Sequence, residues 1–221
     1  ALALQITKDA VWLEATPEGT TAEGIEEVVY TVKPENKVDL LLELLEDPAW
    51  DQVLVFTRTK AGADALRSRL ERAQIGTDTM HSDRRMQDRT RALGRFSSGK
   101  VRVLVATDVA QRGLDVEGIS HVLNYDVPVD PEDYVHRIGR TARAGRDGQA
   151  ISLVCVDENK LLKDIENLLN FKIPKEVVAG YEPDPSIKAE PISRGRSQLQ
   201  APGKRTGKRK PNQTNRKQNP G

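Results

Sequence analysis

Three arginines spaced three residues apart are the side chains of this sequence best suited to bind an anion. Arg137, Arg140 and Arg143 lie in the run His136-Arg-Ile-Gly-Arg-Thr-Ala-Arg-Ala-Gly145. On one helical turn, side chains with this spacing share a face, where their like charges repel one another. Because guanidinium groups bind phosphate oxygens bidentately, the run predicts a site for a nucleotide or nucleic-acid phosphate. The alternative is a solvated basic turn.

The elements that must position these arginines alternate between apolar strands and amphipathic helices. Strands that are apolar on both faces, each followed by a helix, are typical of a parallel sheet covered on two sides, in the α/β class. Apolar spacing predicts strands at residues 28–32, 53–56, near Asp78, 101–106, 122–125 and 150–156. It predicts helices over residues 38–45, 63–73, 86–96, 132–140 and 161–169.

Polar clusters follow three of the expected strands. Residues 57–60 follow the strand at 53–56, residues 81–83 follow the short strand near Asp78, and residues 107–115 follow the strand at 101–106. In parallel sheets the functional loops leave the carboxyl ends of the strands. All three clusters therefore lie where a ligand is expected.

Length and composition indicate one soluble domain with polar extensions. The 221 residues are enough to bury a core, and the sequence contains 37% hydrophobic and 30% charged residues. No apolar run approaches the roughly 18 residues that cross a bilayer, and no signal segment opens the sequence, so we expect a cytoplasmic location and no membrane contact. The single cysteine, Cys155, lies in an apolar stretch, which favours a buried thiol over a catalytic one.

The net charge of +1 combines an acidic body with a basic tail. Residues 194–221 contain nine Lys or Arg and no Asp or Glu, which leaves 25 basic and 33 acidic residues in 1–193, a charge of −8. Binding of a polyanion by the body therefore requires a local basic surface. The tail can attract phosphate backbones without sequence preference.

The pattern of elements ends before the sequence does. Beyond about residue 172 it gives way to Pro- and Gly-punctuated sequence, and from Ile192 onward there is too little apolar surface to offset the entropy of ordering. We expect a linker or the end of an upstream domain over residues 1–22, one domain over 23–175, an extended segment over 176–193 and a disordered basic tail over 194–221.

Three motifs in this order resemble the C-terminal RecA-like domain of DEAD-box RNA helicases. They are Val53-Leu-Val-Phe-Thr-Arg-Thr-Lys60, Ala106-Thr-Asp-Val-Ala-Gln-Arg-Gly-Leu-Asp115 and the run from His136 to Gly145. The ending Gly180-Tyr-Glu-Pro-Asp-Pro-Ser-Ile-Lys-Ala-Glu-Pro-Ile192 with its basic tail resembles the bacterial RhlE subgroup. The resemblance implies a three-layer α/β/α fold with a mostly parallel sheet and a role in ATP-dependent RNA unwinding.

The resemblance assigns roles around the arginine run. It implies that Arg140 and Arg143 reach the γ-phosphate of an ATP held by the other RecA-like domain. Such arginine fingers are worth about 10³ to 10⁵ in rate, because a fixed cation stabilises charge on the transferring phosphoryl group. His136 would couple this run to the partner domain, the alternative being a capping or structural histidine.

The other two motifs carry the implied RNA contacts. By resemblance, Thr107 and the backbone of Gly113 face the RNA sugar-phosphate chain, and Gly113 also borders the ATP site. Asp115 would accept a hydrogen bond from the ATP ribose, the alternative being a turn or capping aspartate. Thr59 and Arg89 would contact RNA phosphates, whereas Phe56 is expected in the core.

The sequence departs from the family pattern at three positions. Met86 stands where a glutamine is expected, and Gln87 is one place late, which turns a helical side chain by about 100°. Ser82 and Ala142 each replace a family glycine. These departures concern the fine geometry of the RNA contacts.

The sequence contains no Gly-x-x-x-x-Gly-Lys-Ser/Thr loop and no Asp-Glu-Ala-Asp run, which bind triphosphate and Mg²⁺ in the N-terminal RecA-like domain. The chain is therefore expected to be half of an enzyme, inactive alone, with no metal ligands of its own. Its expected partners are RNA, ATP with Mg²⁺ bound through the N-terminal domain, and that domain itself. Factors of ribosome assembly or RNA degradation are candidate protein partners. The alternative is a stand-alone, non-catalytic RNA-binding or scaffold module, and related helicases act on DNA.

Overall fold

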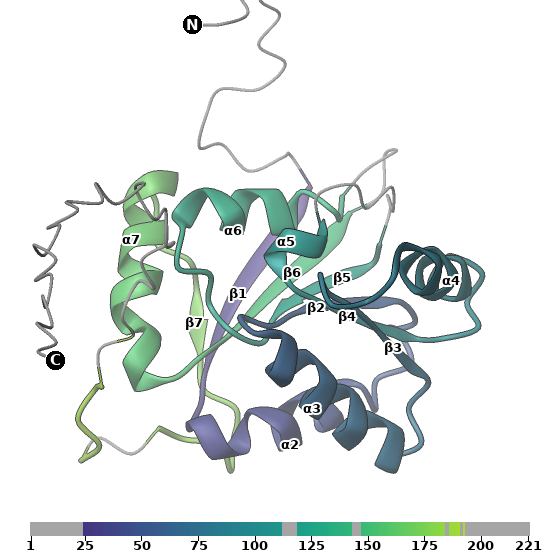
Figure 1. Ribbon diagram of the computed structural model, residues 1–221. Coiled ribbons are helices and arrows are strands. Elements are labelled where there is room, and N and C mark those ends of the chain that lie inside the picture. Colours follow the sequence, from purple (N-terminus) through teal and green to yellow (C-terminus); the bar gives the residue numbers. More distant parts are fainter. Residues whose placement is uncertain (1–23, 112–118, 143–146, 184–185, 191, 193–221) are drawn as a thin grey trace, which may run out of the picture.

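A computed structural model describes residues 24–111, 119–142, 147–183, 186–190 and 192 (Figure 1). Its centre is a seven-stranded sheet in the order β3-β4-β2-β5-β6-β1-β7, in which every pair of neighbouring strands is parallel. The strands are β1 (Ile25–Thr31), β2 (Val53–Phe56), β3 (Thr77–Met80), β4 (Val103–Ala106), β5 (His121–Asn124), β6 (Gly148–Val154) and β7 (Lys175–Glu176).

Helices cover both faces of this sheet (Figure 1). One face packs against α2 (Lys37–Leu44) and α3 (Lys60–Arg72). The other packs against α4 (Met86–Ser97), α6 (Pro131–Ile138) and α7 (Asn159–Leu169). Three short elements complete the fold: α5 (Asp108–Gln111) and the 3-10 helices η1 (Pro34–Asn36) and η2 (Val156–Glu158).

The alternation of side chains along β2 shows why this arrangement forms three layers. Val53 and Val55 pack with the α2 and α3 side, whereas Leu54 and Phe56 pack with the α4 side, and all four are at most 1% exposed. A strand buried on both faces needs an apolar residue at every position, which the sequence supplies. The predicted α/β fold with helices on both faces is confirmed, as is the burial of Phe56 and Cys155.

The differences from the predicted elements are local. Strand β7 has only two residues, and both are charged and exposed. No apolar pattern in the sequence therefore predicts it. It forms by pairing with β1. Helix α5 is a single turn. Helix α6 ends at Ile138 rather than at residue 140, so Arg140 lies in the turn that follows the helix. The expected segments 1–22 and 194–221 lie outside the described residues.

Two helix starts are fixed by side chains at the carboxyl ends of strands. Thr59, after β2, accepts a hydrogen bond from the backbone N–H of Gly62 and so caps α3. Asp130, after β5, caps α6, with Pro131 as the first helical residue. Because the sheet is parallel, these loops lie at one edge together with those that follow β3 and β4. Among the described residues, no helix combines the length and the hydropathy of a membrane-spanning segment.

Candidate functional site

A hollow of about 380 Å³ opens at the carboxyl edge of the sheet. It is lined by side chains from the loops after β2, β3 and β4, namely Arg58, Thr59, Lys60, Ser82, Thr107, Asp108 and Val109. Thr59 and Thr107, both expected to contact RNA, are 48 positions apart in the sequence and lie in this one hollow. The structure therefore brings together residues of two of the motifs.

The cap at the start of α3 leaves the Thr59 hydroxyl available as a donor. Its Oγ1 accepts the Gly62 N–H at 2.9 Å, and the side chain is exposed. A hydroxyl that accepts in this way retains its own proton for an outside acceptor, such as a phosphate oxygen. Gly62 suits this close approach, because a Cβ there would lie 3.0 Å from the Thr59 Oγ1.

Arg89 lies in the first turns of α4 and joins that helix to α5. Its Nη2 donates to the backbone carbonyl of Ala110 at 3.1 Å, and its Nε is buried without a partner among the described residues. Ala110 adjoins the lining residue Val109, so the structure places Arg89 at the border of the hollow and not in its lining. Its expected contact with RNA stays a prediction.

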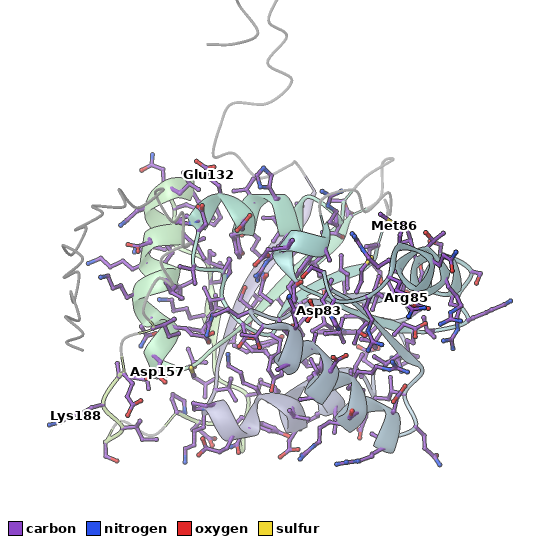
Figure 2. All side chains as sticks on the ribbon, viewed as in Figure 1. Asp83, Arg85, Met86, Glu132, Asp157 and Lys188 are labelled. Atoms are coloured by element: carbon purple, nitrogen blue, oxygen red, sulfur yellow. The ribbon has the colours of Figure 1, made fainter. Side chains whose placement is uncertain are left out.

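The departures from the family pattern have different structural consequences. Met86 begins α4 and is 69% exposed, and Figure 2 labels it beside that helix. Ser82 lines the hollow, and its backbone stays out of the left-handed region. Ala142, in contrast, has a φ of 51°, a conformation that favours glycine.

A salt-bridged group holds the loop after β3. Asp64 Oδ1 accepts from Arg84 Nη2 at 2.6 Å and lies 3.2 Å from His81 Nε2. Burial raises the pKa of the Asp64 carboxyl, but the hydrogen bonds from His81 and Arg84 outweigh it and lower this pKa overall. On the same loop, Asp83 pairs with Lys60 Nζ at 2.6 Å. These contacts tie the loop that carries Ser82 to α3.

Arg137 is a buried structural residue. It is 0% exposed, and its Nε and Nη2 bind the two carboxylate oxygens of Asp108 at 2.6 and 2.8 Å. Its Nη1 donates to Asn124 Oδ1 at 2.9 Å and to the carbonyl of Asp126 at 2.8 Å. The guanidinium carbon also lies 5.0 Å from the centre of the Phe56 ring.

The expectation that the three arginines of the run share an external anion is therefore wrong for Arg137. Its counter-charge is Asp108, which lies 29 positions earlier and belongs to another motif. The assumption of one helical turn also fails, because α6 ends before Arg140. Arg143, Gly113 and Asp115 lie outside the described residues, so their expected roles stay predictions.

The turn that carries Arg140 is anchored on both sides. Before it stands the buried Arg137, whose carbonyl accepts the Arg140 N–H at 3.2 Å. After it, the buried Thr141 donates through Oγ1 to the carbonyl of Ile119 at 2.5 Å. Thr141 also passes so close to Gly148 that a Cβ there would lie 1.7 Å from the Thr141 Oγ1.

The structure thus separates Arg140, an expected ATP-facing residue, from the expected RNA contacts Thr59 and Thr107. Ile119 precedes β5 and Gly148 begins β6, so the half-buried Arg140 lies toward the amino ends of these strands, on the α6 side. Thr59 and Thr107 lie at the opposite, carboxyl edge. His136, in the last turn of α6, is exposed, and its coupling role stays a prediction.

Sequence reasoning missed a buried ionic cluster beside the hollow. Glu158, only 1% exposed, pairs with Lys37 Nζ at 2.5 Å and with Arg58 Nη2 at 2.8 Å. It also accepts the backbone N–H groups of Val127 and Cys155 at 3.0 and 3.2 Å. One carboxylate therefore joins the ends of β2, β5 and β6 to α2. No local pattern could have found it, since its members span 121 positions.

Hydroxyls, an arginine and a lysine converge on the hollow, an arrangement that suits a sugar-phosphate chain. Among the described residues, no group of three or more His, Cys, Asp or Glu could hold a metal ion. A three-layer domain with a parallel sheet, hydroxyl and cationic side chains at its carboxyl edge and an anchored arginine turn after α6 is typical of the class of RecA-like helicase domains.

The comparisons with known proteins narrow this class. The family model "Helicase conserved C-terminal domain" matches residues 36–145. The chain is 41% identical over 174 residues to the ATP-dependent RNA helicase DbpA of Bacillus subtilis, covering 79% of the chain and 36% of that protein. It is 42% identical over 183 residues to the ATP-dependent RNA helicase RhlB of Shewanella frigidimarina, covering 83% of the chain and 42% of that protein.

Solved structures agree with this result. The E. coli DEAD-box protein SrmB, bound to the regulator of ribonuclease activity A, superposes with a TM-score of 0.71 at 36% identity, and the match covers 77% of the chain and 100% of the SrmB chain. S. cerevisiae Dbp5 bound to RNA and ADP BeF3 also gives a TM-score of 0.71, at 30% identity, over 80% of the chain and 47% of Dbp5. The chain belongs to the DEAD-box RNA helicase family and contains its C-terminal RecA-like domain. It spans about two fifths of the length of the curated relatives described above.

Proposed function

We propose that the complete protein is an ATP-dependent RNA helicase of the RhlE type, in which this domain supplies part of the RNA-binding surface and an arginine finger. One observation carries this proposal: residues of separate motifs, Thr59 and Thr107, meet in one hollow that is also lined by two cationic side chains and a third hydroxyl. Phosphate and ribose groups need such donors. The RhlE assignment rests on the ending at residues 180–192 and its basic tail.

The proposed mechanism joins two binding events. Single-stranded RNA occupies the carboxyl-edge hollow, with Arg89 at its border, while Arg140 and Arg143 face an ATP held with Mg²⁺ by the N-terminal RecA-like domain. Gly113 and Asp115 complete the nucleotide contacts, and His136 contacts the partner domain. Together, RNA and ATP close the two domains, and RNA bent by the closed surface cannot stay in a regular duplex. Hydrolysis then reopens the cleft.

The anchored turn gives Arg140 its part in this mechanism. A cation contributes most to a transition state when its position is fixed beforehand, because no reorganisation is then needed during the reaction. Buried neighbours on both sides, Arg137 and Thr141, hold the backbone of Arg140. A freely moving surface arginine would not meet this requirement.

The Arg140→Ala variant of the complete protein tests this role. We expect RNA-stimulated ATP turnover to fall by about 10³-fold or more, because the γ-phosphoryl charge loses its fixed cation. RNA affinity, measured by fluorescence anisotropy, should stay near the wild-type value. Arg69→Ala, which removes an exposed arginine on α3, is the matched control and should leave turnover unchanged. Normal turnover in Arg140→Ala would reject the arginine-finger role.

The remaining assignments follow from the same proposal. The basic tail adds sequence-independent affinity for phosphate backbones, so RNA binding weakens with salt. A competition between RNA and DNA single strands distinguishes an RNA helicase from a DNA-directed relative. We place the protein in the cytoplasm. SrmB is bound to a regulator of ribonuclease activity, and factors of RNA degradation or ribosome assembly are the proposed class of protein partner.

A further inference from the structure

Arg58 is the one arginine that lines the carboxyl-edge hollow. It stands between Phe56 and Thr59 in the sequence, at the end of β2, and its side chain is 29% exposed. Neither the family pattern nor the sequence reasoning above gives it a role. Its surroundings determine whether its positive charge is neutralised within the protein or is available to a ligand.

The guanidinium group of Arg58 is held at one end only. Its Nη2 binds Glu158 Oε1 at 2.8 Å and lies 3.4 Å from the carbonyl of Val127. Its Nε is buried and has no hydrogen-bond partner among the described residues. A buried donor without a partner costs about 1 to 3 kcal/mol, and no contact with a described residue offsets this cost at Nε. The group is therefore oriented by the protein but not saturated.

The partner of Arg58 is already neutralised by another cation. Glu158 also pairs with Lys37 Nζ, which is 4% exposed and donates further to the carbonyl of Tyr125 at 2.8 Å. One buried carboxylate thus faces two cations, and the cluster of Lys37, Arg58 and Glu158 carries an excess positive charge. The excess lies on Arg58, because it is the more exposed of the two cations.

Two other carboxylates beside the hollow have counter-charges of their own. Asp108 is bound bidentately by the buried Arg137, and Asp83 pairs with Lys60. Asp126 accepts the backbone N–H of Arg58 through Oδ2 at 2.8 Å, which positions the main chain at this point. Among the described residues, the ion pair of the Arg58 side chain is thus the one with the shared Glu158.

We propose that Arg58 is a further RNA-binding residue, which contacts a phosphate of the single strand beside Thr59, and that Glu158 is its positioning residue. Arginine held in a fixed orientation binds phosphate with less loss of side-chain entropy than a free one. The adjacent Thr59 hydroxyl supplies a second donor to the same region of the backbone. This inference rests on the proposed function, since it names a contact within the same RNA-binding hollow.

Salt dependence of RNA binding tests the proposal in the full chain. For single strands, each phosphate neutralised contributes about 0.7 to the slope of log affinity against log salt. We expect Arg58→Gln to weaken binding of a single-stranded oligoribonucleotide by about tenfold at low salt, the effect of one charged hydrogen bond. The slope should become about 0.7 shallower. The tail contributes equally in both proteins, so the difference isolates Arg58.

Two further variants separate binding from structure. Arg58→Lys retains the charge and should restore the slope, although without the bidentate geometry its affinity stays below wild type. Arg69→Gln removes an exposed arginine of α3 that faces Asp39 at 3.9 Å, and it should change neither affinity nor slope. Urea unfolding of each variant reports any loss of the Glu158 contact independently of RNA.

Each outcome decides the question. A weaker affinity with an unchanged slope would show that Arg58 acts only through packing, and it would overturn the proposal, as would an unchanged affinity. Weakened binding of a fluorescent ATP analogue to the complete protein, with RNA binding intact, would assign Arg58 to the nucleotide and also overturn it. If the wild-type protein binds no RNA, the proposed function itself fails, a result that is distinguishable from a failure confined to Arg58.

Discussion

The two ends of the sheet differ in whether their carboxylates are paired with cations. At the carboxyl end, the carboxylates Asp108 and Glu158 are bound by buried cations, and hydroxyls and cations face the hollow. At the amino end, a hollow of about 370 Å³ is bordered by Glu26, Asp47 and Asp147, which are exposed and form no ion pair with any described residue. The comparison indicates which of the two hollows can bind a polyanion, because unpaired carboxylates repel phosphate and paired ones do not.

The paired charges at the carboxyl end fix the positions of loops more than they raise the free energy of unfolding. Burying an ion pair costs about as much in desolvation as the pair returns in attraction, so such pairs add little net stability. They do fix loops relative to one another: Arg137 joins α6 to α5, and Glu158 joins three strand ends. The amino end has no such cluster among the described residues, and its best-defined contact is the stacking of Trp50 on His121 at 4.5 Å.

The largest expected effect comes from removing Arg137. Arg137→Met leaves Asp108 and the Asn124 side chain without their partner, and the loss of one member of a buried ion pair costs about 3 kcal/mol. The cost lies at the lower end of the range for buried pairs because the Asp108 side chain is 27% exposed. Urea unfolding measures the change. Arg91→Met removes a surface pair with Asp88 and should cost less than about 0.5 kcal/mol. Equal losses in the two variants would remove the distinction between paired structural charges and surface charges.

A smaller effect is expected at Ala142, which lies toward the amino ends of β5 and β6. Its φ of 51° strains an L-residue by about 1 to 2 kcal/mol. Glycine would relieve this strain, but it loses more conformational entropy on folding than alanine, which offsets part of the stabilisation. Ala142→Gly should therefore raise the free energy of unfolding by about 0.5 to 1 kcal/mol. Ser82→Gly, at a position without positive φ, should lower it by a similar amount. A lower free energy of unfolding in Ala142→Gly would show that the backbone at Ala142 is not strained.

The smallest effect is a pH dependence at the amino end. Burial lowers the pKa of His121, although the hydrogen bond to Gln149 and the charges of Asp51 and Asp47 oppose this. Below the ordinary histidine pKa of about 6.5 the unfolded chain binds the proton first, so stability is highest above that pH and falls on acidification toward the lowered pKa. In His121→Phe, which keeps the stacked ring but cannot ionise, this part of the decline between pH 7 and 5 should vanish. An identical decline in both proteins would assign it to other groups.

The sequence predicts the central strands well, because their burial on both faces leaves an apolar residue at every position, as in β2 and β4. It also places Thr59 and Thr107 at strand ends, from which the common hollow follows once the sheet is parallel. It cannot show that Arg137 finds Asp108 across 29 positions, or that Lys37 and Glu158 meet across 121. Such pairs depend on which strands become neighbours, and no short-range pattern encodes that order.

Hydrogen exchange of the complete protein, with and without single-stranded RNA and a non-hydrolysable ATP analogue, tests the contrast between the two ends most directly. We expect RNA to protect the backbone amides of residues 57–60, 82–89 and 107–110 at the carboxyl edge. The amides of residues 47–51 and 147–149, beside the amino-end hollow, should exchange as before. Protection of the amino-end segments with unchanged exchange at the carboxyl edge would contradict the assignment of the RNA site.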